Sequence, residues 1–330
     1  MCQRRTGRLT AAVAAAAVLA GCGAGADTRP SGPANSTVPP SPSGSATAPG
    51  GGPSAPARAT GVAPSDTFPV GIRRLSVNRG GARPLPVTIW YPATDSGGSA
   101  PQPAAGRFPV VLFSHGLTAR PADYGPLLTA WAAAGFVVAA PAFPHTSRGA
   151  SRFDVFDVVN QPADASYVLT QVLALDRKAG DPLRGRLNTD RVGAAGHSAG
   201  GITTIGLFTL GRDERLDAGI VLAGSALGVG TAFTGPAAPQ LFVHGQLDDV
   251  VSYPAGKAAY DAVPWPKAMV SLPDGDHGRG IMRSGNKAFG VVTDTTVEFL
   301  RWTLYADPAA KRRLPATATR GGLADLDDRL

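Results

Sequence analysis

Residues 191–205 read RVGAAGHSAGGITTI, and Gly196-His197-Ser198-Ala199-Gly200 at their centre matches the pattern G-x-S-x-G. In a chain with 42 glycines this pattern alone is weak, so its context matters. An apolar run, Val192–Ala195, precedes it, and an apolar helical pattern begins at Ile202. A strand, a sharp turn and a helix would present the Ser198 hydroxyl at the helix N-terminus, where backbone N–H groups face a developing negative charge. We therefore expect Ser198 to be a nucleophile.

A serine hydroxyl needs a base, and of the five histidines only His277 follows a plausible acid downstream of Ser198. An apolar run, Leu241–Val243, leads to Asp248 and Asp249, and another ends just before His277. Side chains that leave parallel strands at their carboxyl ends meet at one edge of a sheet. We expect His277 to take the serine proton, and one of the two aspartates to orient the imidazole.

The rest of the chain alternates strand and helix patterns, which predicts an α/β fold with a mainly parallel sheet and helices on both faces. The expected strands are residues 70–77, 85–91, 109–114, 136–141, 191–197, 218–223, 240–245 and 268–272, and the expected helices are 121–134, 162–179, 199–210, 254–262 and 286–305. The remaining histidines are expected to be structural: His115, His145, His197 and His244. No cluster has the spacing of metal ligands, and we expect neither a metal nor a cofactor.

His-Gly-x-x-Asp-x-x-Val at residues 244–251 and Gly-x-His-Gly at 275–278 resemble the surroundings of the acid and base in α/β-hydrolases. The resemblance implies an α/β-hydrolase fold and favours Asp248 over Asp249 as the acid. It also implies an oxyanion hole made of two backbone N–H groups. These would be those of Ala199 and of Leu117, which lies in the loop Ser114-His115-Gly116-Leu117-Thr118.

Within this superfamily, residues 85–92 resemble platelet-activating-factor acetylhydrolases, and residues 115–120 with 134–138 resemble cutinase-like polyester hydrolases. Dienelactone hydrolases of the same group use a cysteine, which the expected domain lacks. The resemblance implies a serine carboxylic-ester hydrolase that forms an acyl-enzyme on short-to-medium acyl esters or lipid-like esters. Acetylhydrolase or lipase-like activity, polyester degradation, amide or thioester hydrolysis, and a binding lipoprotein on an inactive scaffold stay open.

The resemblance also implies a more aliphatic pocket, because the aromatic clamp of polyester hydrolases is absent: its positions correspond to Leu117, His197 and Ser225-Ala226-Leu227. No long insertion interrupts the expected sheet, so a large lid is not expected. Residues 143–161, with Phe153 and Phe156, are the candidate for a small flap.

The N-terminus has the pattern of an export signal. Three arginines precede an apolar run from Leu9 to Ala20, and Leu19-Ala20-Gly21-Cys22 resembles the lipobox of bacterial lipoproteins. We expect a signal peptide over residues 1–21, a lipid on Cys22 that anchors the protein to the extracytoplasmic face of a membrane, and a disordered linker over 22–67. Residues 68–305 would form the catalytic domain, and 306–330 a polar, peripheral tail.

Composition narrows the possible partners. The chain has 330 residues, of which 43% are hydrophobic and 17% charged, so a sizeable core is expected. Its two cysteines, Cys2 and Cys22, exclude a disulfide in the expected domain. The formal net charge is +7, but the basic residues form no stripe with aromatics between them, so we expect no nucleic-acid binding. We expect a monomer whose partners are its ester substrate and the membrane.

Overall fold

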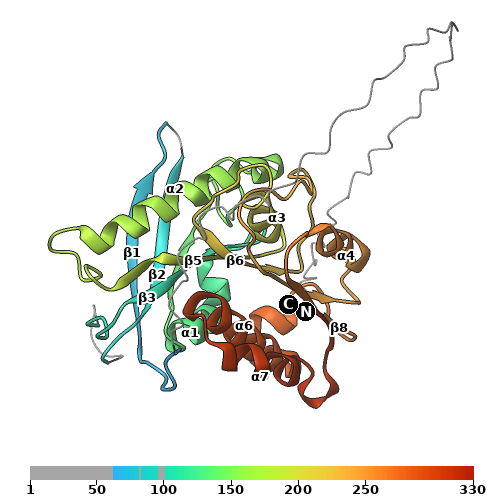
Figure 1. The fold of residues 1–330 in the computed structure, drawn as a ribbon. Helices are drawn as coiled ribbons and strands as arrows, with labels where there is room; N and C mark the ends of the chain where they lie inside the picture. Colours follow the sequence, from blue (N-terminus) through green and yellow to red (C-terminus); the bar gives the residue numbers. More distant parts are fainter. Residues whose placement is uncertain (1–61, 82, 96–100) are drawn as a thin grey trace, which may run out of the picture. The chain divides into compact units, whose positions relative to one another are not determined.

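A nine-stranded sheet runs through the residues that the computed structural model describes, which are 62–81, 83–95 and 101–330 (Figure 1). Its order is β1-β2-β4-β3-β5-β6-β7-β8-β9. The six strands from β4 to β8 in this order are parallel, whereas β2 is antiparallel to β1 and β4, and β9 is antiparallel to β8. The strands are β1 (Val70–Asn78), β2 (Pro84–Pro92), β3 (Phe108–Ser114), β4 (Val137–Pro141), β5 (Leu187–His197), β6 (Leu216–Leu222), β7 (Gln240–Gly245), β8 (Lys267–Leu272) and β9 (Asp325–Arg329).

The central strands are buried on both faces, as their continuous apolar sequences predict. Every residue of β3, β4, β7 and β8 is buried. By contrast, the edge strand β1 alternates between half-buried and exposed side chains over most of its length. The predicted α/β class with a mainly parallel sheet is therefore confirmed.

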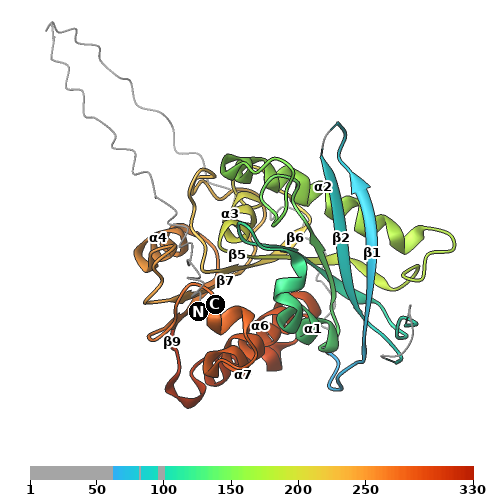
Figure 2. The same cartoon turned by 180° about the vertical axis from the view of Figure 1, so that it is seen from behind.

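Helices cover both faces of the sheet (Figures 1 and 2). One face carries α1 (Gly125–Ala133), α5 (Arg279–Met282), α6 (Lys287–Tyr305) and α7 (Pro308–Ala318), and the other carries α2 (Gln161–Ala174), α3 (Ala199–Gly206) and α4 (Tyr253–Ala262). Short 3₁₀ helices η1 (Pro121–Tyr124), η2 (Val155–Asn160), η3 (Leu175–Arg177) and η4 (Arg320–Gly322) lie between them. The two layers have separate cores: Trp131 and Phe299 belong to the first, Val168 and Phe208 to the second.

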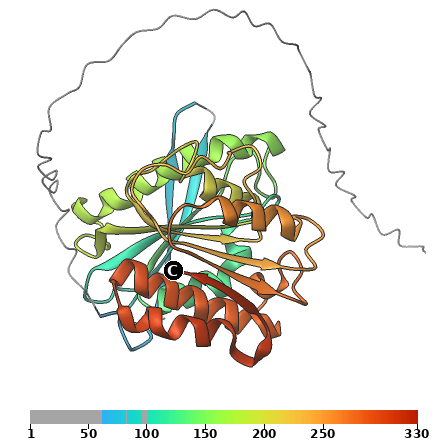
Figure 3. The same cartoon turned by 45° about the vertical axis from the view of Figure 1, so that its right-hand side comes forward.

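Residues 306–330 are not the peripheral tail that we expected. They form α7 and β9, and β9 pairs with β8 from Lys267 to Ser271. Leu314 on α7 is fully buried in the core below the sheet. The prediction was wrong because it took the polar composition of this segment to mean that the segment lies outside the fold. An edge strand and an outer helix need few apolar residues. In Figure 3 α7 lies on one side of the sheet, with α2 and α4 on the other, while β9 forms an edge of the sheet itself.

The predicted signal peptide (1–21), the lipidation site Cys22 and the linker up to residue 61 lie outside the described residues. The end of the predicted linker belongs to the domain instead: Ala63 is buried, and Arg301 donates a hydrogen bond of 3.0 Å to the Pro64 carbonyl. In the described ranges, no helix combines the length and the apolar character needed to cross a membrane.

Candidate active site

Ser198 lies in a strained turn between β5 and α3. Its backbone has φ 58° and ψ −121°, which a residue with a Cβ rarely adopts. A Cβ on Gly196 would lie 2.0 Å from the Gly200 carbonyl oxygen, and a Cβ on Gly200 would lie 1.9 Å from that of Ser114. Both positions therefore need glycine, which explains the G-x-S-x-G pattern. The Ser198 N–H donates to the Leu222 carbonyl (2.9 Å), which ties the turn to the end of β6.

The structure brings Ser198, His277 and Asp248 together in one hydrogen-bonded chain. His277 Nδ1 lies 2.8 Å from Asp248 Oδ2, and His277 Nε2 lies 2.8 Å from Ser198 Oγ. Because the carboxylate accepts, Nδ1 of a neutral imidazole carries the proton, and Nε2 is left to accept the serine hydroxyl proton. These are the positions that a nucleophile, a base and an orienting acid require.

Asp248 is buried and tightly held. Its Oδ1 accepts the N–H groups of Val250 (2.9 Å) and Val251 (2.8 Å), and its Oδ2 also lies 3.2 Å from His244 Nε2. Burial alone would raise the pKa of Asp248, but hydrogen bonds from His244, His277 and the two N–H groups hold it well below its usual range. Asp249, the other candidate, is exposed and makes no contact with His277 among the described interactions. Of the two candidates, Asp248 is therefore the one that contacts His277.

The loop after β3 is held so that the Leu117 N–H is free. His115 Nδ1 donates to the Gly116 carbonyl (2.7 Å), and the Ala119 N–H also donates to it (3.2 Å). In a planar trans peptide the N–H points away from the carbonyl, so the Leu117 N–H faces the opposite way. Among the described residues it has no acceptor, and Leu117 lines the same cleft as Ser198. A Cβ on Gly116 would lie 3.1 Å from that of Ser198, so the loop lies directly against Ser198.

The second oxyanion donor that we expected is the N–H of Ala199. Ala199 is the first residue of α3, directly after Ser198. The first N–H groups of a helix have no acceptor inside the helix. Both candidate donors therefore lie on segments that adjoin Ser198.

Two buried side chains link this loop to the base. The Tyr124 hydroxyl accepts the Gly116 N–H (3.0 Å) and lies 2.9 Å from His197 Nδ1, and His197 Nε2 lies 2.6 Å from the His277 carbonyl. That carbonyl can only accept, so the proton of His197 is on Nε2, and Tyr124 donates to Nδ1. Burial lowers the pKa of His197 to about 4, which keeps it neutral. The sequence identified His197 only as structural and did not identify Tyr124, since nothing local signals a contact across 73 residues.

The site opens into a cleft of about 600 Å³. Its walls are the loops 116–119 and 276–279, with Met282 and Arg148 beside them. Of the positions where we expected aliphatic lining, Leu117 and His197 line this cleft, whereas residues 225–227 do not.

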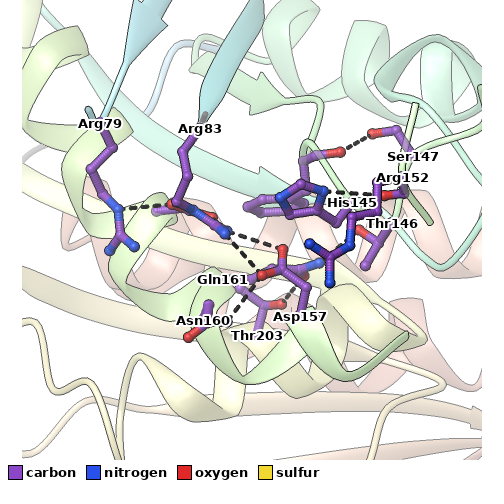
Figure 4. Close-up of polar contacts among 12 residues, drawn as sticks. Arg79, Arg83, His145, Thr146, Ser147, Arg152, Asp157, Asn160, Gln161 and Thr203 are labelled. Carbon is purple, nitrogen blue, oxygen red and sulfur yellow. Dashed lines mark hydrogen bonds and ion pairs between the residues drawn. The ribbon is translucent and has the colours of Figure 1, made fainter. Parts of the chain in front are cut away.

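The predicted flap, residues 143–161, is firmly attached at its base (Figure 4). Arg83 donates to Asp157 (2.8 Å) and to Asp164. Gln161 bridges Thr146 (2.7 Å) on the flap and Thr203 (2.6 Å) on α3.

The phenylalanines of the flap differ in exposure. Phe143 is fully buried, while Phe153 and Phe156 are 52% and 80% exposed. The flap therefore has a hydrogen-bonded polar base and exposed apolar side chains.

No group of three or more histidine, cysteine, aspartate or glutamate side chains suited to a metal ion occurs in the described part of the chain. The chemistry that these residues can perform is nucleophilic attack with proton transfer.

Comparison with known proteins gives one family. The model of the Chlorophyllase family matches residues 92–246, a range that contains Ser198, Leu117 and Ala199 and ends just before Asp248. No curated protein matches the chain.

Proposed function

Since this chain belongs to the α/β-hydrolase superfamily, as the Chlorophyllase family does, we propose that it is a serine hydrolase of carboxylic esters. The observation that carries this proposal is the unbroken hydrogen-bonded chain from Ser198 through His277 to Asp248. The family match supports a hydrolase of esters in general terms, and the serine mechanism is our own inference.

In this mechanism His277 Nε2 takes the Ser198 proton as Oγ attacks the ester carbonyl carbon. The N–H groups of Ala199 and Leu117 bind the resulting oxyanion, each contributing about 3 kcal/mol to the transition state. Asp248 stabilises the imidazolium, which then protonates the leaving alcohol. A water molecule, deprotonated by the same histidine, releases the acid from Ser198.

Apart from Tyr124, the large apolar side chains that line the cleft are Leu117 and Met282, and neither is aromatic. The cleft therefore suits acyl chains better than stacked rings. We therefore propose short-to-medium acyl esters or lipid-like esters as substrates.

We also propose that Cys22 carries a lipid that holds the enzyme on the extracytoplasmic face of a membrane. The support is the lipobox-like sequence Leu19-Ala20-Gly21-Cys22 after an apolar run. Cys22→Ala is expected to move the protein from the membrane fraction to the soluble fraction. Equal membrane retention of both forms would contradict lipidation.

The test of the catalytic proposal is Ser198→Ala. We expect the variant to lose labelling by a fluorophosphonate and to lose p-nitrophenyl butyrate hydrolysis by about 10⁴-fold or more, because only an activated serine reacts. Ser284→Ala, an exposed serine outside the hydrogen-bonded chain, is the matched control.

Absence of labelling in the wild type would instead support an inactive binding scaffold. Labelling without ester turnover would point to an amide or thioester substrate, which a panel of both classes identifies.

A further inference from the structure

The cleft that contains Ser198 has an excess of positive charge. Three arginines line it, Arg148, Arg279 and Arg283, against two carboxylates. Arg148 pairs with Asp123, and Arg279 Nε lies 2.8 Å from Asp276 Oδ2. Arg283 has no carboxylate partner within the described ranges and is exposed at the cleft. The charge of Arg283 is therefore available to a ligand.

A second cleft, of about 630 Å³, adjoins the first and shares Arg148 with it. The wall between them is formed by two hydrogen-bonded loops: the Thr118 N–H donates to the Thr146 carbonyl (2.8 Å), and the Arg148 N–H to the Ala119 carbonyl (3.2 Å). A ligand long enough to cross this wall would occupy both clefts.

The second cleft has basic side chains and apolar walls but no acid. Arg74, Arg120 and Arg148 line it, and no aspartate or glutamate is among its lining residues. Arg120 Nε donates to the Arg148 carbonyl (2.7 Å), and no described carboxylate pairs with Arg120 or Arg74. Apolar lining comes from Pro84, Pro86, Val87, Pro121 and Phe143.

Unpaired guanidinium groups at a cleft attract anions and bind carboxylates or phosphates through charge-assisted hydrogen bonds. Apolar walls beside them suit a hydrocarbon chain. We propose that the ester cleaved at Ser198 carries an anionic group, such as a carboxylate, which is attracted by the unpaired arginines of the two clefts: Arg283 in the first, and Arg74 and Arg120 in the second. This inference rests on the proposed esterase function and adds the charge class of its substrate.

The experiment compares two esters that differ in one charge. Both are p-nitrophenyl esters of the ten-carbon dicarboxylic acid; one keeps its far carboxylate and the other has it capped as a methyl ester. We expect the wild type to have a kcat/KM at least tenfold higher for the charged ester at low salt. This preference should shrink towards one in 0.5 M NaCl, since salt screens exposed charges.

The triple variant Arg74→Gln/Arg120→Gln/Arg283→Gln is expected to lose the preference, so that the ratio of the two kcat/KM values falls close to one. Arg312→Gln, which removes an exposed arginine of α7, should keep the wild-type ratio. If circular dichroism shows that the triple variant is unfolded, the single variants are compared, and each should lower the ratio.

The outcomes separate the two proposals. Equal turnover of both esters by the wild type would overturn the anionic substrate and leave the esterase standing. A preference that persists in the folded triple variant would overturn the role of these arginines. Turnover of neither ester, with no labelling of Ser198, would overturn the proposed function itself.

Discussion

The Tyr124 hydroxyl joins two parts of the candidate site, since it accepts from the loop after β3 and donates towards the segment that carries His277. It accepts a hydrogen bond from the Gly116 N–H (3.0 Å) and donates one to His197 Nδ1 (2.9 Å), and His197 Nε2 in turn donates to the His277 carbonyl (2.6 Å). Through these contacts one side chain positions both the loop that carries the Leu117 N–H and the segment that carries the imidazole. Tyr124 is thus a positioning residue that touches no reacting atom.

Tyr124→Phe is expected to lower kcat about tenfold with little change in KM. It leaves the buried Gly116 N–H without an acceptor and His197 Nδ1 without a donor, so loop and base lose their fixed geometry. Steady-state kinetics with p-nitrophenyl butyrate and the rate of fluorophosphonate labelling measure the effect.

Tyr305→Phe is the matched control, because it removes a tyrosine hydroxyl that donates to the Gly135 carbonyl (2.6 Å) far from the cleft lining. It should lower thermal stability and leave kcat unchanged. Equal kcat values for the two variants would show that Tyr124 is merely structural.

At the scale of elements, the β1–β2 hairpin holds the flap and α2 through buried charge. Arg83 bonds to Asp157 on η2 and Asp164 on α2, and Arg79 Nε lies 2.9 Å from Asp164 (Figure 4). The Asp164 side chain is fully buried and that of Asp157 is 5% exposed. Two buried carboxylates destabilise the fold unless cationic partners neutralise their charge.

Arg83→Met is therefore expected to lower the free energy of unfolding by about 3 kcal/mol, since it leaves buried carboxylates short of a partner. Urea unfolding at pH 7 measures it. Arg107→Met is the control, because it breaks an ion pair with Asp176 in which the Arg107 side chain is 52% exposed. It should lower the free energy of unfolding by only about 0.5 kcal/mol. A loss of similar size in both variants would show that the Arg83 cluster has no special structural role.

The sequence predicts those elements whose apolar composition indicates that they are buried. The strands β3 to β8 are predictable because continuous apolar runs such as Pro109–Phe113 are stable only when both faces of the strand are buried. The turn around Ser198 is predictable from its G-x-S-x-G pattern. β9, Asp-Leu-Asp-Asp-Arg, was not predicted, because an edge strand is stabilised by backbone pairing and needs no apolar run. The link from Tyr124 to His197 was also missed, since it depends on how distant segments pack.

At the scale of the whole molecule, β9 closes the edge of the sheet next to the strand that leads to the base. It pairs with β8 from Lys267 to Ser271, while Leu326 and Leu330 pack against the core. His277 lies five residues beyond the end of β8. The last residues of the chain therefore stabilise the strand that precedes the loop of His277.

Removal of residues 325–330 is expected to lower the melting temperature by several degrees and to promote aggregation, because it exposes the backbone groups of β8. Thermal unfolding and light scattering measure these effects. Asp328→Asn, which changes an exposed side chain and keeps the pairing, is the control. An unchanged melting temperature after truncation would contradict this role for β9.

Two buried histidines, His115 and His197, make the stability of the whole molecule depend on pH. Burial lowers the pKa of His115 and of His197 to about 4 from the ordinary 6.5. Between these values the unfolded chain binds more protons than the folded one, so the free energy of unfolding falls as pH decreases from 6.5 to 4. We expect a loss of several kcal/mol over this range, measured by urea unfolding at pH 7, 6, 5 and 4. Carboxylates whose pKa is lowered begin to add their losses only below about pH 5, so constant stability from pH 7 to 5 would refute the neutral, buried state of both imidazoles.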